Sequence, residues 1–134
     1  DNDVYPIAQT LGAWTAAEQG AKFFENIVNE NTTSDRQLII HEVMGRHCGW
    51  LTAATAFEYR KRLQRLPFID EINMCREKWD VHSVLLPEDE INFDKECERL
   101  NKIMDKYDCV NIFLSEGAGQ QLIIDEKIRK TDCL

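Results

Sequence analysis

The chain contains no run of apolar residues near the roughly 20 that a membrane-spanning helix needs. Its five cysteines form no Cys-x-x-Cys pair, which argues against a zinc knuckle or a thioredoxin-type site. It also has no excess of positive charge, because 16 Lys and Arg stand against 24 Asp and Glu, a net charge of −8. A duplex-binding protein usually carries a basic stripe, so we predict neither a nucleic-acid nor a membrane partner.

No initiating methionine and no secretion signal precede the opening residues Asp1-Asn2-Asp3, which resemble the interior of a longer chain. Scattered thiols are typical of a reducing compartment, so we expect a cytoplasmic protein. The glycosylation sequon at Asn31 is accordingly interpreted as a chance match. The 134 residues suit one domain rather than two, and no linker or repeat divides them.

Two kinds of hydrophobic periodicity alternate along the chain. Apolar residues recur every three or four positions in three segments, which predicts helices over residues 8–29, 50–65 and 93–107, the last with Asn92 as N-cap. Short apolar runs predict strands over residues 38–44, 81–86 and 110–114, and the near-continuous run 38–44 indicates a strand covered on both faces. This alternation predicts a three-layer α/β fold, with helices on both faces of a mainly parallel sheet.

Ligands of parallel sheets gather where the strands end, and three such ends carry polar residues. Met44-Gly45-Arg46 follows one strand; Gly45 would let the backbone approach a ligand, and Arg46 could grip phosphate or sugar oxygens. Glu116 follows another strand and could accept hydrogen bonds from a sugar hydroxyl. The alternatives are an ordinary turn with a surface arginine, and a carboxylate favoured by a helix N-terminus. Glu88 follows the predicted strand 81–86 and is expected to be structural.

Other residues could carry chemistry. Asp1 and Asp3 would point the same way in an extended segment, one as a general base and the other holding magnesium-bound water; a solvated acidic turn is the alternative. The neighbours His47 and Cys48 are a poor nucleophile pair, because adjacent residues seldom meet in catalytic geometry. The other two histidines, His41 and His82, lie inside predicted strands and are expected to be satisfied in the core.

Together these segments resemble the phosphofructokinase family. Asp1-Asn2-Asp3 resembles the end of the family's Thr-Ile-Asp-Asn-Asp motif, and Glu42-Val43-Met44-Gly45-Arg46-His47-Cys48-Gly49 resembles its sugar-phosphate-binding segment. Ser115-Glu116-Gly117 falls where the family has a sugar-contacting glutamate. The continuation from Trp50 to Ala56 and the extra polar stretch 66–80 are most similar to the pyrophosphate-dependent branch. The resemblance extends to about Gly119.

The resemblance implies a role for individual residues. Asp1 would deprotonate the 1-hydroxyl of fructose 6-phosphate, and Asp3 would lie near the phosphoryl donor and its Mg²⁺. The residues that would bind fructose 6-phosphate are Met44, Gly45, Arg46 and Glu116. Arg36, or Gln37 if the register differs by one residue, would reach into a neighbouring subunit's site. The expected assembly is therefore a homo-oligomer with shared active sites.

The implied reaction transfers a phosphoryl group from pyrophosphate to fructose 6-phosphate, giving fructose 1,6-bisphosphate in glycolysis. The alternatives are an ATP-dependent 6-phosphofructokinase, a non-catalytic regulatory subunit of the same fold and a stand-alone α/β binding module. The family's glycine-rich donor-binding loop has no counterpart in this sequence, so residues 1–134 are interpreted as one segment of a partial domain. We expect the segment alone to be inactive, and phosphoryl transfer that Asp1→Asn abolished would contradict this.

Overall fold

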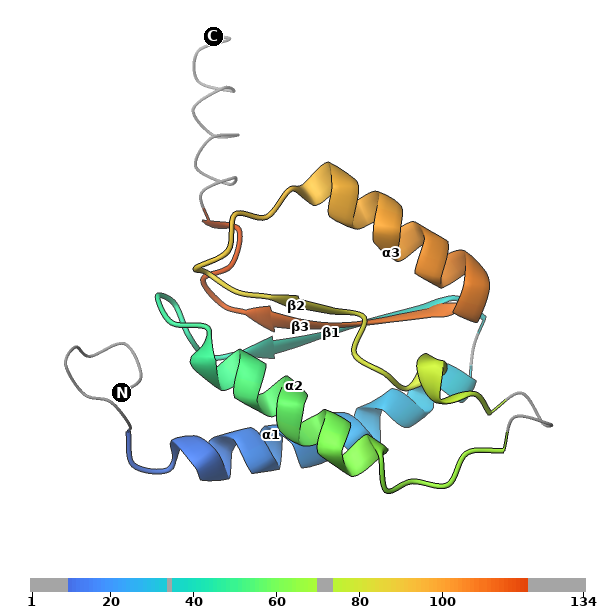
Figure 1. Cartoon of the computed structure of the whole chain (residues 1–134), viewed down its shortest axis with the longest axis horizontal. Coiled ribbons are helices and arrows are strands. Elements are labelled where there is room, and N and C mark those ends of the chain that lie inside the picture. Colours follow the sequence, from blue (N-terminus) through green and yellow to red (C-terminus); the bar gives the residue numbers. More distant parts are fainter. Residues whose placement is uncertain (1–9, 34, 70–73, 121–134) are drawn as a thin grey trace, which may run out of the picture.

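The computed structural model describes residues 10–33, 35–69 and 74–120 (Figure 1). Three strands form one parallel sheet in the order β1-β3-β2. Their bounds are Gln37–Val43 for β1, Ser83–Leu85 for β2 and Cys109–Ser115 for β3. All three strands therefore end at the same edge of the sheet, where the sequence places its candidate functional residues.

Helices lie on both faces of this sheet (Figure 1). Helices α1 (Ala13–Ile27) and α2 (Trp50–Leu63) cover one face side by side, and α3 (Phe93–Tyr107) lies against β3 on the other. Two short 3₁₀ helices complete the described part, η1 (Val28–Thr32) after α1 and η3 (Arg76–Lys78) before β2. The predicted α/β fold with a parallel sheet between helical layers is confirmed.

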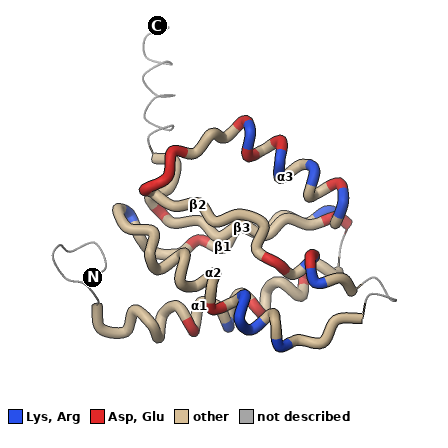
Figure 2. The backbone as a smooth tube through the Cα atoms, viewed as in Figure 1, with Lys and Arg blue, Asp and Glu red and all other residues tan. Residues whose placement is uncertain are grey.

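The predicted element boundaries differ from the observed ones by a few residues. The helix expected over 8–29 starts at Ala13, and the strand expected over 81–86 shortens to three residues. The N-cap of α3 is as predicted, because Asn92 Oδ1 accepts the backbone N–H of Lys95 at 3.1 Å. Charges of both signs alternate along α3, which is typical of a solvent-facing helix (Figure 2). The segment after Gln120 lies outside the described residues.

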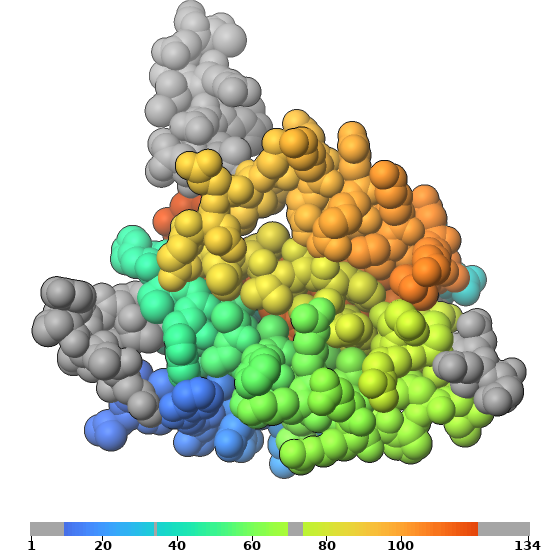
Figure 3. All heavy atoms as spheres, in the orientation of Figure 1, coloured from blue at the N-terminus to red at the C-terminus, as the bar shows by residue number. Residues whose placement is uncertain are grey.

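Three fully buried aromatic side chains from different elements form the centre of the core. Phe24 of α1 lies with its ring centroid 4.7 Å from Tyr59 of α2 and 4.6 Å from Phe113 of β3, in edge-to-face geometry. Burial of each such side chain stabilises the fold by about 1.5–3 kcal/mol. Tyr59 also donates its hydroxyl to the carbonyl of Trp79. These contacts hold α1 and α2 together against the sheet. The surfaces of the two helices adjoin in Figure 3.

The prediction that the first strand is covered on both faces is wrong for β1. Its burial alternates along the strand, and Leu38 and Ile40 remain 55% and 53% exposed. The physical reason is position: β1 is at the edge of the described sheet, whereas α3 lies against the central strand β3. Among the strands that the structure describes, only β3 is buried along almost its whole length. An apolar run therefore identified a strand without revealing its place in the sheet.

The polar stretch before β2 is held by Asn111 in the middle of β3. The Asn111 amide donates to the carbonyls of Lys78 at 3.0 Å and Asp80 at 2.9 Å, while its oxygen accepts from Asn31 at 2.9 Å. His82 Nδ1 accepts the backbone N–H of Asn111 at 2.9 Å, and Nε2 donates to the Glu77 carbonyl at 2.9 Å. His82 is thus a satisfied structural histidine, as expected, and the hydrogen bond that Nδ1 accepts requires its neutral form.

The ring of His41 packs among aromatic rings, with centroids 5.3 Å from Phe24 and 5.0 Å from Phe113, and burial lowers its pKa. The unfolded chain therefore binds the proton more readily. The contribution of His41 to folding stability should therefore be fully present above about pH 6.5. It should decline as the pH falls towards the lower pKa that His41 has in the folded chain. We expect His41→Phe, which keeps an aromatic ring, to reduce this acid loss in urea unfolding curves measured between about pH 5 and 8.

The comparison is made with the parent chain in the same urea and pH series. Part of the loss should persist in the His41 variant, because burial also lowers the pKa of His82. An acid loss as large in His41→Phe as in the parent chain would contradict the prediction.

Candidate active site

Two loops meet at the carboxyl edge of the sheet, one after β1 and one after β3. The strands pair in parallel with Val43 opposite Ser115, so both loops leave the sheet at the same level. Glu116 N–H then donates to the Val43 carbonyl at 3.0 Å, and Gly117 N–H donates to the Gly45 carbonyl at 3.3 Å. The two loops are therefore joined backbone to backbone beyond the end of the regular strands.

This joining brings two predicted site residues together, although they lie 70 positions apart in the sequence. Arg46 Nε donates to Glu116 Oε1 at 3.2 Å. The Arg46 side chain is 62% exposed and that of Glu116 is 31% exposed. An ion pair this exposed contributes little to stability, about 0–1 kcal/mol. The consequence of the pair is geometric, because it holds the Nε side of an exposed guanidinium at the carboxyl edge of the sheet.

The backbones of the two loops approach so closely that glycine is required at the contact. A Cβ on Gly117 would lie 1.7 Å from the Arg46 carbonyl oxygen. A Cβ on Gly45, whose φ is 148°, would lie 2.4 Å from the Cys48 carbonyl oxygen. Ser115, which is fully buried, adds a hydrogen bond from its hydroxyl to the Gly45 carbonyl at 2.5 Å. Sequence reasoning missed the role of Ser115, because nothing in its neighbourhood indicates which carbonyl it would reach.

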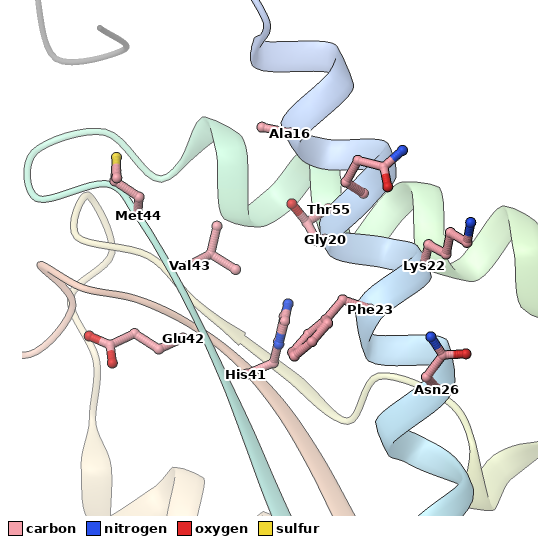
Figure 4. Close-up of a pocket in the computed structure, with 11 residues that line it drawn as sticks. Ala16, Gly20, Lys22, Phe23, Asn26, His41, Glu42, Val43, Met44 and Thr55 are labelled. Carbon is pink, nitrogen blue, oxygen red and sulfur yellow. The ribbon is translucent and has the colours of Figure 1, made fainter.

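Met44 lies at the mouth of a cavity of about 560 Å³ between α1 and β1, and it is 70% exposed (Figure 4). His41 and Val43 point from β1 towards α1, whereas Glu42 points to the other side of the strand (Figure 4). The α1 side of this cavity presents polar groups, including Lys22 and Asn26. Arg46 and Glu116 are not among the cavity's lining residues. Met44 thus lines a cavity that does not include Arg46 or Glu116, so the structure does not bring it together with that pair.

The third strand end contributes through Glu88, which follows β2. Glu88 Oε1 accepts the backbone N–H of Gly49, the N-cap residue of α2, at 2.8 Å. The structural role that the sequence suggested for Glu88 is confirmed by this contact. Glu88 and Gly117 also line a second cavity, of about 510 Å³, between the loop after β2 and the turn after β3.

Arg36 lies at the opposite end of the sheet. It precedes β1 and pairs with Asp105 of α3, Nη1 to Oδ1, at 2.9 Å. A seven-residue strand rises about 23 Å, so Arg36 cannot reach Arg46 or Glu116 of its own chain. The alternative, Gln37, donates its backbone N–H to the Asp108 carbonyl at 2.8 Å. The two candidate acids of the opening motif, Asp1 and Asp3, lie outside the described residues.

Neither a metal cluster nor a membrane span occurs in the part of the chain that the structure describes. No three His, Cys, Asp or Glu side chains there are grouped to hold a metal ion. Glu116, which lies at the joined loops, already accepts a hydrogen bond from Arg46. Residues 10–33, 35–69 and 74–120 therefore do not form a Mg²⁺ site by themselves. None of the helices in those ranges is long and apolar enough to cross a bilayer.

Comparison with known proteins gave a family and close relatives. The family model described as phosphofructokinase matches residues 1–132. A pyrophosphate–fructose 6-phosphate 1-phosphotransferase from Methylomonas methanica is 60% identical over 126 residues, which cover 94% of this chain and 31% of the relative. Its counterpart from Mastigamoeba balamuthi is 49% identical over 130 residues, covering 97% and 32%. The chain thus spans about a third of the length of the curated relatives it matches.

One solved structure supports the fold. Phosphofructokinase from Pichia pastoris in the T-state superposes with a TM-score of 0.52 and 23% identity, over 88% of this chain and 11% of that one. At this identity the likeness concerns the fold alone.

Proposed function

The chain belongs to the phosphofructokinase family, and we propose that it forms the sugar-phosphate-binding part of an enzyme that transfers a phosphoryl group from pyrophosphate to the 1-hydroxyl of fructose 6-phosphate. The observation that carries the proposal is the pairing of Arg46 with Glu116 on two joined loops at the carboxyl edge of the sheet. Edges of this kind are where parallel sheets bind ligands.

Each residue of this site has a chemical task that its geometry suits. Arg46 uses Nε for Glu116, which leaves the N–H groups of its terminal nitrogens for the oxygens of a sugar phosphate. Glu116 holds the guanidinium and retains a second oxygen that can accept a sugar hydroxyl. Gly45 is buried, and its lack of a side chain makes room for the Cys48 carbonyl of its own loop, so it shapes the loop of Arg46 and does not open the backbone to the substrate as the sequence suggested. Asp1 is the proposed general base, by its place in the family motif.

Phosphoryl transfer depends mainly on positioning and electrostatic stabilisation. The part of that work proposed for the described residues is to fix the sugar so that its 1-hydroxyl meets the base and the donor. Mg²⁺, when bound, would neutralise charge on the phosphoryl groups, and the described residues do not form its site. The proposed product is fructose 1,6-bisphosphate, made in the glycolysis of the cytoplasm.

Pyrophosphate is the proposed donor because both relatives reported above carry that substrate in their names, at 60% and 49% identity. The complete enzyme is proposed to be a homo-oligomer with shared sites. Arg36 supports this reading, because it lies at the end of β1 remote from Arg46 and is exposed, as a residue serving another subunit's site would be.

The test is turnover of fructose 6-phosphate by the complete polypeptide that carries this chain, with Mg²⁺ and either pyrophosphate or ATP. We expect turnover with pyrophosphate and none with ATP. Turnover with ATP alone would keep the site and assign the other donor. No turnover with either donor, while fructose 6-phosphate still binds, would indicate a regulatory subunit and contradict the proposal.

A further inference from the structure

The loop that carries Arg46 is fixed at both of its ends by other strands. At its start, Gly45 is held by the loop after β3, through Gly117 N–H and the Ser115 hydroxyl. At its end, the Gly49 N–H is held by the carboxylate of Glu88, which follows β2 and lies 39 positions along the chain. The anchor at Glu88 is the only one of these contacts made by a charged side chain.

Glu88 supplies a contact that α2 cannot make for itself. The first backbone N–H groups of a helix lack partners within the helix, and a glutamate at the third helical position often reaches back to the N-cap N–H. In α2 that position is Thr52, whose buried hydroxyl has no partner among the described residues. The carboxylate of Glu88, which follows β2, accepts the Gly49 N–H in place of such a glutamate. Its negative charge is favoured at a helix N-terminus.

The fit around this contact is close. Gly49 is buried, and a Cβ there would lie 2.7 Å from Glu88 Oε2 and 2.9 Å from Leu86 Cβ. The segment 86–88 therefore presses directly on the start of α2. Because only His47 and Cys48 separate Arg46 from Gly49, an anchor at Gly49 limits how far Arg46 can move.

We propose that Glu88 is a positioning residue for fructose 6-phosphate: it holds the Gly49 amide, and through that amide it fixes the loop that presents Arg46 to the sugar phosphate. This inference rests on the proposed function and adds a residue that acts on the substrate through the backbone. Without the anchor, the loop must be ordered each time the sugar binds, and that cost weakens binding.

The experiment compares Glu88→Ala, Glu88→Asp and Glu88→Gln in the complete polypeptide. We expect Glu88→Ala to raise the KM for fructose 6-phosphate about tenfold and to leave the KM for pyrophosphate within about twofold. Glu88→Asp, one methylene shorter, should resemble the alanine variant. Glu88→Gln retains an acceptor oxygen and should restore most of the parent value. Glu90→Ala, which removes an exposed carboxylate lining the same cavity, is the matched control and should change neither KM.

Three results would overturn the proposal. An unchanged KM for fructose 6-phosphate in Glu88→Asp would do so even if the alanine variant failed to fold. A lower kcat with both KM values unchanged would indicate a merely structural role. A KM for fructose 6-phosphate that rises as much in Glu88→Gln as in Glu88→Ala would indicate that the negative charge, and not the hydrogen bond, is needed.

Failure of the proposed function can be distinguished from failure of the role proposed for Glu88. If the unmodified polypeptide shows no turnover, equilibrium binding of fructose 6-phosphate and hydrogen exchange of the Gly49 amide still report on the anchor. Weaker binding and faster exchange in Glu88→Asp than in Glu88→Gln would support the positioning role, and equal values in the two variants would exclude it.

Discussion

Replacing Arg46 with alanine in the complete polypeptide is expected to raise the KM for fructose 6-phosphate about 100-fold and to change kcat much less. Hydrogen bonds that involve charged groups contribute about 1.5–3 kcal/mol each, and a guanidinium can form two with one phosphate or carboxylate. Arg46 presents these donors because Glu116 fixes its Nε side at 3.2 Å. Loss of ground-state binding appears mainly in KM, which steady-state kinetics at varied sugar phosphate would measure.

Two further variants make this result specific. Arg46→Lys keeps the charge without the fork of donors, so its KM should lie between those of the parent and the alanine variant. Arg65→Ala, at an exposed arginine after α2, should leave sugar kinetics unchanged. The folding stability of Arg46→Ala should stay within about 1 kcal/mol of the parent, because the ion pair is exposed. A parent-like KM would remove Arg46 from the proposed site.

Much of the fold was predictable, because periodicity and capping are local properties. The spacing from Phe93 to Tyr107 and the Asn92 cap identified α3 with the observed bounds. The run over residues 38–44 identified β1 to within one residue. What local pattern could not provide was the order of strands in the sheet. Leu38 and Ile40 have the apolar character of a buried strand, yet they are exposed because β1 is at an edge.

The stretch between α2 and β2 escaped prediction for a related reason. Its described part is held by side chains that are remote in sequence, above all Asn111 on β3. An asparagine within an apolar strand gives no local signal of the carbonyls it will bind. The hydrogen bond of His82 to the Asn111 backbone depends in turn on the pairing of β2 with β3.

In the candidate site, too, the sequence predicted the residues but not the remote contacts that bring them together. The sequence alone predicted that Arg46 and Glu116 belong to one site. The prediction came from the family resemblance and from the rule that ligands of parallel sheets bind where the strands end. The structure adds what joins them: backbone hydrogen bonds between the two loops and the close approach at Gly117. Such contacts depend on the parallel register of β1 and β3, which side-chain chemistry does not encode.

The close approach of Gly117 to the Arg46 backbone predicts a second large mutational effect. Gly117→Ala is expected to lower kcat/KM for fructose 6-phosphate at least about 100-fold and to destabilise the fold by about 2–3 kcal/mol. The new Cβ would lie 1.7 Å from the Arg46 carbonyl oxygen, and 2.9 Å from its Cα. Because these are backbone atoms, no rotamer change relieves the clash and the loops must separate. Separation breaks the hydrogen bond from Gly117 N–H to Gly45 and moves Arg46 away from Glu116.

Gly119→Ala tests whether this effect belongs to the contact or to the turn as a whole. Gly119 lies two residues further on with φ 74°, so alanine there should cost about 1–2 kcal/mol of stability through backbone strain. Its Cβ would meet only the ring of Phe93, at 3.1 Å, and no part of the Arg46 loop. We therefore expect Gly119→Ala to lower the urea midpoint while the KM for fructose 6-phosphate stays at the parent value. If both alanine variants raised that KM equally, the site would depend on general stability of the turn, and the specific contact between Gly117 and the Arg46 carbonyl would have no separate role.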